Sequence, residues 1–299
     1  MNRGFKMVKV GIVLVNYNGA KYQNDCIRTL YGMEYSDFIV IVVDSCSKDN
    51  SLDLLEQEFP EVHILRQTEN VGVARGNNIG IQYCMKLGAE YTLLLNNDTE
   101  VDEKMLSHLL CSANATTVTV PKIYFFQNNN VLWFAGGWLD WNKATAFHRG
   151  INEIDREQYD KEEYINYSPT CCMLIHNDIF KKVGLVDEKI FMYFDDTDLC
   201  VRFLEAHISI KYIPKAKVWH KVSSSSGGMV SKIGIYYSNR NQLYYMKKYK
   251  NRISARAKIR IILRGLAKGV LSPFRNLNDR YILIAYSDYL IGKMGRKNF

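Results

Sequence analysis

The sequence lacks the marks of a membrane-spanning, disulfide-rich or repetitive protein. No apolar run reaches the roughly eighteen residues of a transmembrane helix, and no internal repeat is present. The sequence has seven cysteines, an odd number, and the spacing between them matches no zinc-binding pattern. This indicates reduced thiols in a cytosolic protein. The N-terminal stretch "MNRGFKMVKVGIVLVNYNG" has charges before a short apolar run but no small-residue cleavage site. We therefore interpret that run as a first strand and not as a signal peptide.

The composition is that of a globular protein, but the charge is unevenly distributed. Hydrophobic residues make up 47% of the 299 residues and charged residues 23%, enough for a sizeable core. Residues 245–299 hold 14 Lys and Arg against two acids, a net charge of +12, whereas residues 1–244 have a net charge of −4. We therefore predict a globular part, 1–244, and a basic tail, 245–299, that faces a different partner.

Strand-like and helix-like segments alternate in the first hundred residues, which predicts βαβ units and a mostly parallel sheet. The predicted strands are 8–17, 38–45, 62–67 and 91–98, and the predicted helices are 20–33, 51–59 and 72–88. The later pattern is less regular. We expect a strand and a helix in 169–184, a helix in 191–206, a strand broken by proline in 208–220 and a loop in 221–228, and we find no clear period in 131–141.

Polar residues stand where three of these predicted strands end. They are Asn16 with Tyr17, Asp44, and Asn97 with Asp98. Ligands bind at the carboxyl ends of parallel strands, so we expect these residues to meet in one crevice. The turn at Asp98 offers oxygen ligands to Mg²⁺ or Mn²⁺, and Asp44 could accept a hydrogen bond from a nucleobase. The alternative interpretation of both is an ordinary turn.

Three further groups carry candidate chemistry. Gly72, Gly76 and Gly80 stand four apart, which allows either close approach to a ligand or tight helix packing. The acids at positions 195, 196 and 198 repel one another, which raises a pKa and favours proton acceptance. Acid enrichment in a first helical turn is the alternative. His220 ends a predicted strand, where it is either a ligand or a structural residue.

The basic tail contains an amphipathic pattern. Arg256, Arg260, Arg264 and Lys268 recur every four residues, and the apolar residues Ile259, Ile262, Leu263, Leu266 and Val270 fall on another face. This is typical of a helix, from about residue 254 to 271, that lies in a membrane interface. The alternative is a helix whose apolar face packs on the globular part.

Taken in order, the motifs resemble those of family 2 glycosyltransferases with a GT-A fold, near the bacterial rhamnosyltransferase-like branch. They are "VLVNYNG", "VVDSCSKDNS", "NVGVARGNNIG", "LLLNNDT", "WFAGG", "FMYFDDTDLCVR", "VWHKVSSSSGG", "YYSNRNQL" and "IGKMG". The resemblance spans nearly the whole chain. It implies an α/β fold with a mostly parallel mixed sheet flanked by helices, and transfer of a sugar from a nucleoside diphosphate donor with inversion.

The resemblance also implies roles for individual residues. Asp196 would be the catalytic base beside Asp195, and Asp98 with His220 would hold Mg²⁺ or Mn²⁺ at the donor diphosphate. The serines that follow His220 would belong to a loop that closes on the donor phosphates. The donor-binding residues would be Asn16, Tyr17, Asp44, Asn70, Gly72, Arg75 and Asn97. The sequence departs from the family pattern in having Asn96 and Asn97 before the metal carboxylate, Asp195 in place of Glu, and "PTCCM" in place of a Gly-Ala-Cys pattern.

The expected activity is metal-dependent inverting sugar transfer, with rhamnose from dTDP-rhamnose as the leading donor. The expected acceptor is a hydroxyl on a lipid-linked cell-surface polysaccharide. The basic tail would then hold the enzyme on the cytoplasmic face of the cell membrane. Two alternatives remain open at this point: a nucleotidyltransferase, which would need a basic phosphate loop near the N-terminus, and a basic nucleic-acid-binding protein. Because the cations are confined to an amphipathic tail, we expect no nucleic-acid partner.

Overall fold

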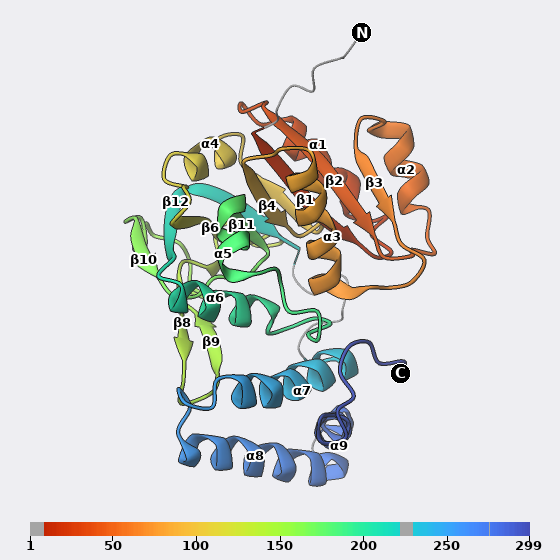
Figure 1. Ribbon diagram of the computed structural model, residues 1–299, viewed down its shortest axis with the longest axis vertical. Coiled ribbons are helices and arrows are strands. Elements are labelled where there is room, and N and C mark those ends of the chain that lie inside the picture. Colours follow the sequence, from red (N-terminus) through yellow and green to blue (C-terminus); the bar gives the residue numbers. More distant parts are fainter. Residues whose placement is uncertain (1–8, 222–229, 275) are drawn as a thin grey trace.

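The computed structural model describes residues 9–221, 230–274 and 276–299 and contains a central mixed sheet flanked by helices (Figure 1). Its strand order is β10-β12-β6-β11-β4-β1-β2-β3, with β5 beside β12 and β7 beside β6. The neighbours β4, β1, β2 and β3 run parallel, as the alternating pattern predicted. Their bounds are Val10–Asn16 for β1, Phe38–Asp44 for β2, His63–Arg66 for β3 and Tyr91–Leu95 for β4.

Three helices connect the parallel strands: α1 (Gln23–Tyr31), α2 (Ser51–Glu58) and α3 (Gly72–Lys86). Helix α3 lies directly on β1. A Cβ atom at Gly76 would come within 2.7 Å of the side chain of Val15, and one at Gly80 would overlap Val13. The packing interpretation of these two glycines is therefore confirmed, because no larger residue fits between the helix and the strand.

The second half of the sheet mixes strand directions. Strand β11 (Cys172–His176) runs antiparallel to both β4 and β6 (Thr117–Phe125). Strand β12 (Ser209–His220) runs parallel to β6, and its pairing register shifts between Ile213 and Lys217. Pro214 therefore interrupts the register of the pairing, but the strand continues through it. The smaller elements are β5 (Thr99–Val101), α4 (Met105–Leu110), β7 (Leu132–Phe134), β10 (Glu163–Ile165) and α5 (Asn177–Val183).

The segment without a clear period begins a hairpin. Strands β8 (Gly137–Asp140) and β9 (Thr145–His148) pair with each other and extend away from the main sheet toward the C-terminal helices (Figure 1). The turn of the hairpin contacts these helices, because Arg260 donates a hydrogen bond of 2.7 Å to the carbonyl of Asn142. Gln242 likewise donates to the carbonyl of Lys143 over 2.9 Å.

Helix α6 (Asp195–Glu205) lies between the sheet and a C-terminal group of α7 (Lys232–Lys248), α8 (Ala255–Val270) and α9 (Arg280–Leu290). The proposed boundary after residue 244 falls within α7. The helix predicted from about 254 to 271 is confirmed as α8, whose N-cap Ser254 accepts a hydrogen bond from the backbone of Ala257. Helix α8 packs on α9 through glycines, since a Cβ at Gly269 would lie 2.6 Å from Leu283.

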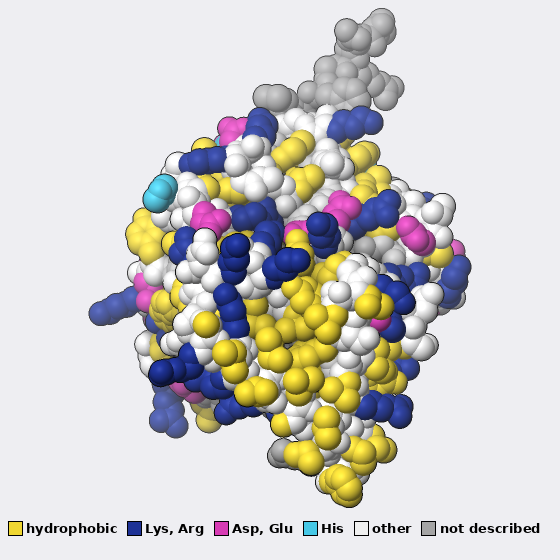
Figure 2. Space-filling view, turned by 60° about the horizontal axis from the view of Figure 1, so that its bottom comes forward, with side chains coloured by type: hydrophobic (Ala, Val, Ile, Leu, Met, Phe, Trp, Pro, Cys, Tyr) yellow, Lys and Arg dark blue, Asp and Glu magenta, His cyan; other side chains and the backbone are white. Residues whose placement is uncertain are grey.

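The apolar residues of α8 largely face outward. The exposed fractions are 59% for Ile259, 60% for Leu263 and 66% for Val270, whereas Ile262 is partly buried against the core. Figure 2 shows a broad hydrophobic area with Lys and Arg around it on this end of the molecule. Within the described ranges, no helix is both long and apolar enough to cross a membrane. The loop expected at 221–228 lies, apart from its first residue, outside the described part of the chain.

Candidate functional site

Asn16 joins the polar ends of the three central strands. Its amide nitrogen donates to Oδ1 of Asp44 over 2.9 Å, and its amide oxygen accepts from Asn97 over 3.0 Å. All three side chains are buried or nearly so. Side chains from β1, β2 and the turn after β4 therefore meet at one sheet edge, which confirms the predicted convergence for Asn16, Asp44 and Asn97.

Asp44 is held rigidly at the end of β2. Its carboxylate is 2% exposed and accepts hydrogen bonds from the hydroxyl of Ser47 at 2.6 Å and from the backbone of Ser47 at 3.1 Å. The ring of Tyr17, which follows β1, is 41% exposed. The carboxylate of Asp44 is thus a fixed acceptor, and Tyr17, one residue beyond the end of β1, presents an exposed aromatic side chain.

The remaining predicted donor-binding residues make contacts of other kinds. The side chain of Asn70 accepts from the backbone N–H of Gly72 over 3.0 Å. Gly72 has a φ of +75°, and a Cβ there would overlap Phe191, in the loop that leads to α6. Arg75 pairs at 3.4 Å with Glu69 on the surface. These contacts of Asn70, Gly72 and Arg75 are therefore with one another, with Phe191 or with the surface acid Glu69.

Asp98 and His220 are neighbours because β5 and β12 pair there, with Thr99 opposite His220. Nε2 of His220 lies 3.2 Å from Oδ1 of Asp98, and the two residues are 7% and 6% exposed. Nδ1 of His220 is buried without a hydrogen-bond partner among the described residues. An imidazole and a carboxylate this close could share one cation.

The ligand set is small, and that fits one kind of site. Within the part of the chain that the structure describes, no group of three or more His, Cys, Asp or Glu residues could hold a metal ion. Mg²⁺ commonly takes only one or two protein carboxylates, with phosphate and water as its other ligands. Asp98 and His220 therefore fit a cation whose remaining ligands come from a bound diphosphate.

The acids Asp195 and Asp196 begin α6. Burial, with the charge of Asp196 as a second cause, raises the pKa of Asp195 to about 7. Burial also raises the pKa of Asp196, against hydrogen bonds from Tyr167 and Thr197 that lower it. The predicted rise in pKa is confirmed, although its leading cause is desolvation and not repulsion between the acids.

A strained turn presents this acid pair. Tyr193 and Phe194 both have positive φ values, 61° and 72°, which is uncommon for side chains of this size. The amide nitrogen of Asn241, on α7, donates to the carbonyls of Met192 and Tyr193 over 2.8 and 3.0 Å. Helix α7 therefore stabilises the turn from which α6 begins.

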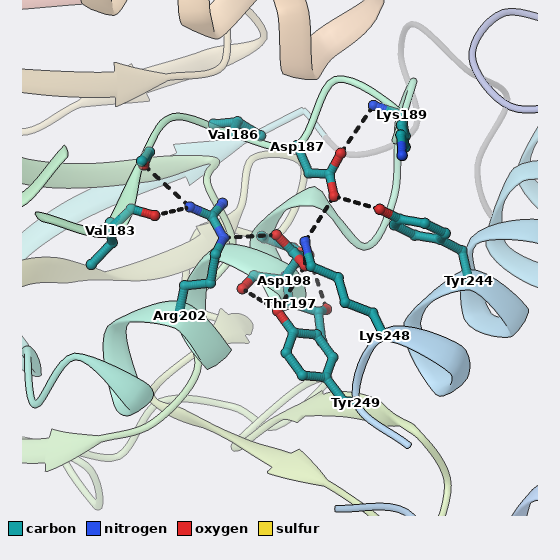
Figure 3. A network of polar contacts seen from close by, with 12 residues as sticks. Val183, Val186, Asp187, Lys189, Thr197, Asp198, Arg202, Tyr244, Lys248 and Tyr249 are labelled. Carbon is teal, nitrogen blue, oxygen red and sulfur yellow. Dashed lines mark hydrogen bonds and ion pairs between the residues drawn. The ribbon is translucent and has the colours of Figure 1, made fainter. Parts of the chain in front are cut away.

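The third acid, Asp198, has a structural environment. It is 1% exposed and accepts hydrogen bonds from Arg202 at 2.9 Å and Tyr249 at 2.8 Å, and Lys248 lies 2.6 Å away (Figure 3). Figure 3 shows these cations and the tyrosine converging on one carboxylate from α6 and α7. The helix-turn interpretation accounts for Asp198, which anchors the first turn of α6 to α7.

Residues 170–171, just before β11, join the candidate cation site to the acid pair. The backbone N–H of Asn96 donates to the carbonyl of Cys171 over 2.9 Å. The adjacent hydroxyl of Thr170 lies 3.3 Å from Oδ2 of Asp195. One short segment therefore contacts both the turn that carries Asp98 and the helix that carries Asp195.

Sequence reasoning missed several residues that support the acids. The hydroxyl of Tyr167 donates to Oδ2 of Asp196 over 2.8 Å, and His148 lies behind Tyr167. Asn241 belongs to the motif "YYSNRNQL", from which the sequence alone predicts no role for it. No periodicity in the sequence marks Tyr167 or His148, because each acts through a contact between segments that are distant in sequence.

Comparisons with known proteins identify the family and the fold. The sequence model of the Glycosyl transferase family 2 matches residues 11–184. The dTDP-rhamnosyl transferase RfbF of Shigella flexneri is 23% identical over 243 residues, which cover 79% of this chain and 79% of that protein.

Two solved structures are similar in fold. GalNAc-T7 with UDP, GalNAc and Mn²⁺ has a TM-score of 0.62 at 15% identity, over 81% of this chain and 48% of that chain. The mannosyltransferase PcManGT from Pyrobaculum calidifontis, in complex with GDP-Man and Mn²⁺, has a TM-score of 0.55 at 13% identity, over 94% and 87%. At these identities the likeness shows a shared fold.

Proposed function

Because the chain belongs to the Glycosyl transferase family 2 and has its GT-A fold, we propose that it is an inverting enzyme that uses a nucleoside diphosphate sugar. Asp196 acts as the base that removes the proton from an acceptor hydroxyl. Asp98 and His220 hold a divalent cation, Mg²⁺ or Mn²⁺, against the diphosphate. Asn16, Tyr17, Asp44 and Asn97 line the donor side. The resemblance also assigns Asn70, Gly72 and Arg75, at the start of α3, to the donor.

The acid pair at the start of α6 carries this proposal. A carboxylate whose pKa lies above its ordinary value, and which is only half-buried, can meet a hydroxyl and accept its proton. General-base catalysis of this kind supplies on the order of 10²–10⁴ in rate, and positioning of the two substrates supplies more. Asp195, buried beside the base, keeps the pair at a raised pKa.

The cation would neutralise the negative charge that develops on the nucleoside diphosphate as it leaves. The protein contributes a carboxylate and an imidazole that are already adjacent, on paired strands. Two structures of similar fold contain Mn²⁺, one with UDP and GalNAc and the other with GDP-Man, which supports the use of a divalent cation without distinguishing Mg²⁺ from Mn²⁺.

For the donor we propose dTDP-rhamnose. The support is the similarity to the dTDP-rhamnosyl transferase RfbF over most of both chains. A fixed carboxylate at Asp44 suits the imide N–H of a thymine or uracil ring, since an ionised carboxylate only accepts hydrogen bonds.

For the acceptor we propose a lipid-linked saccharide, met at the cytoplasmic face of a membrane. The support is the set of exposed apolar side chains on α8, to which the C-terminal region adds Phe274, 88% exposed, and Leu290, 80% exposed. Arg256, Arg260 and Arg264 line an open groove on this surface together with Ile259 and Leu263. Apolar side chains beside cations suit the boundary between acyl chains and anionic headgroups.

A panel of radiolabelled nucleotide sugars tests the enzyme's proposed reaction. With Mg²⁺ or Mn²⁺ present, we expect release of nucleoside diphosphate from one donor, with dTDP-rhamnose preferred, and faster release when a membrane extract supplies acceptors. Asp53→Asn, a change of an exposed acid on α2, serves as the matched control for Asp196→Asn. Release of sugar 1-phosphate, with the nucleoside monophosphate moved to the acceptor, would indicate nucleotidyl transfer instead and would overturn the proposal.

A further inference from the structure

Behind the proposed base lies a pair of residues with no role in the reaction as described so far. Tyr167, in the segment before β11, is 5% exposed and donates from its hydroxyl to Oδ2 of Asp196 over 2.8 Å. On the other side of that hydroxyl, Nε2 of His148 lies 3.5 Å away. One hydroxyl thus faces two groups, and the chemistry of the histidine decides what it can do.

The protonation of His148 is fixed by its surroundings. Its Nδ1 lies 3.1 Å from the backbone carbonyl of Trp133, which can only accept, so Nδ1 carries the proton. The imidazole packs edge-on against the rings of Trp133 and Phe134, with centroids 4.6 and 5.2 Å away. Burial lowers the pKa of His148 to about 4, so the ring is neutral near pH 7. A neutral ring protonated at Nδ1 leaves Nε2 as a bare acceptor.

Tyr167 therefore has one proton and two acceptors. The nearer acceptor, Asp196 at 2.8 Å, takes that proton while the carboxylate is ionised, because hydrogen bonds to charged groups are the stronger ones. The neutral Nε2 at 3.5 Å is the weaker partner in that state. Once Asp196 has been protonated the order reverses, since a carboxylic acid is a poorer acceptor than an imidazole nitrogen.

We propose that Tyr167 and His148 act together as positioning residues that stabilise Asp196 in both of its protonation states. Before the reaction the hydroxyl of Tyr167 donates to the carboxylate. When the acceptor O–H bond breaks and the carboxyl O–H bond forms, the hydroxyl turns to Nε2 of His148. Its oxygen then accepts the new carboxyl proton, and no proton leaves the tyrosine. The cycle closes when Asp196 releases its proton to water and the hydroxyl turns back.

This inference rests on the proposed function, which makes Asp196 the base, but its decisive test needs no substrate. Titratable groups act on Asp196 from several elements: Asp195 and Cys200 on α6, Tyr167 before β11, and His148 on β9 through Tyr167. The two variants below change only the last two groups, so the other groups remain as a constant background.

The experiment follows the side-chain carboxyl ¹³C signal of Asp196 through a pH titration of the full chain. Asp196→Asn assigns the signal, and the signal of Asp195 is read with it because interacting acids titrate in shared steps. Tyr167→Phe should raise the midpoint by about one pH unit, since a hydrogen bond to the ionised form is lost. His148→Asn retains a donor for the carbonyl of Trp133 but removes the acceptor, and should lower the midpoint by about half a unit.

Two controls separate this account from general damage to the fold. His148→Gln can place an oxygen near the position of Nε2 and should restore the wild-type midpoint. The double variant Tyr167→Phe/His148→Asn should behave like Tyr167→Phe alone, because His148 acts only through the hydroxyl. Opposite shifts in the two single variants cannot arise from a common loosening of the site. Shifts in the same direction, or no shift with Tyr167→Phe, would overturn the inference. If the shifts occur but no nucleotide sugar is consumed, the hydrogen-bond pair stands and the proposed function fails.

Discussion

The ammonium group of Lys248 lies 2.6 Å from Oδ1 of Asp198 and 2.7 Å from Oδ2 of Asp187 (Figure 3). One residue of α7 thus joins the first turn of α6 to the loop that precedes it. Lys248 belongs to the proposed tail, 245–299, whereas both carboxylates belong to the proposed catalytic part. The C-terminal helices therefore help to hold the proposed base in place, in addition to any role at a membrane.

Lys248→Met should lower both stability and activity. Asp198 is 1% exposed, and removal of a cation leaves its carboxylate with fewer partners. We expect the free energy of unfolding to fall by about 1–3 kcal/mol and turnover to fall further than donor affinity. Urea unfolding and steady-state kinetics measure the two effects. Lys247→Met, an exposed neighbour on the same helix, is the control and should change neither.

Asp98→Ala should weaken donor binding only when a divalent cation is present. The carboxylate lies 3.2 Å from Nε2 of His220, so its loss removes one of the two proposed protein ligands. Calorimetric binding of dTDP, with Mn²⁺ and with chelator, measures the effect in the wild type and the variant. We expect chelator to weaken binding by the wild type toward the level of the variant. Full activity of chelator-treated wild-type enzyme would show that the proposed cation site is wrong.

The raised pKa of Asp195 predicts a pH dependence of stability. Its pKa is about 7 in the folded protein against an ordinary 3.8, so the folded state binds more protons than the unfolded state between these values. The free energy of unfolding should therefore fall as the pH rises from about 4 through about 7. Asp195→Asn should reduce this slope and be more stable than wild type at pH 8, by on the order of 2–4 kcal/mol. Urea unfolding at pH 5 and pH 8 gives the free energy of unfolding of both proteins. An equal change between the two pH values in wild type and Asp195→Asn would contradict the shift.

Membrane attachment through α8 should depend on both charge and apolar surface. Arg256, Arg264 and Lys268 are changed together to Gln, while Arg260 is kept because it bonds to the β8–β9 turn. Each cation near an anionic leaflet is worth about 1 kcal/mol, so flotation with anionic liposomes should fall strongly. Added salt should weaken the wild type in the same way, since the Debye length is about 8 Å at physiological ionic strength.

Two further variants accompany the flotation experiment, one as a charge control and one that tests the apolar surface. A variant with Lys86, Lys161 and Lys182 changed to Gln removes the same charge from exposed positions outside α8 and should float like wild type. Ile259→Ser with Leu263→Ser keeps the charge but reduces the apolar surface, and should also float less. Equal flotation of every variant, or flotation of none, would rule out this attachment.

Those parts of the fold that depend on local pattern could be predicted from the sequence. Buried apolar runs gave β1, β2 and β4, and their polar ends placed Asn16 next to Asp44 as expected. The helical spacing of apolar and cationic residues gave α8 nearly to its ends. In each case the signal lies within one segment, and the packing of the sheet follows from strand direction.

The contacts that hold Asp195 and Asp196 in place could not be predicted, because they join segments that are distant in sequence. Asn241 reaches the turn at Tyr193 across 48 positions, and Tyr167 reaches Asp196 across 29. Neither residue type is unusual in its own segment. The positive φ angles at Tyr193 and Phe194 also oppose local preference, and they persist because α7 stabilises the turn.

The central claim is that Asp196 removes the acceptor proton, and one variant tests it most directly. Asp196→Asn keeps the shape of the side chain but cannot accept a proton at neutral pH. We expect donor affinity within about twofold of wild type by calorimetry, and single-turnover sugar transfer reduced by about 10²–10⁴. Transfer at more than about a tenth of the wild-type rate, with donor affinity unchanged, would show that the base lies elsewhere.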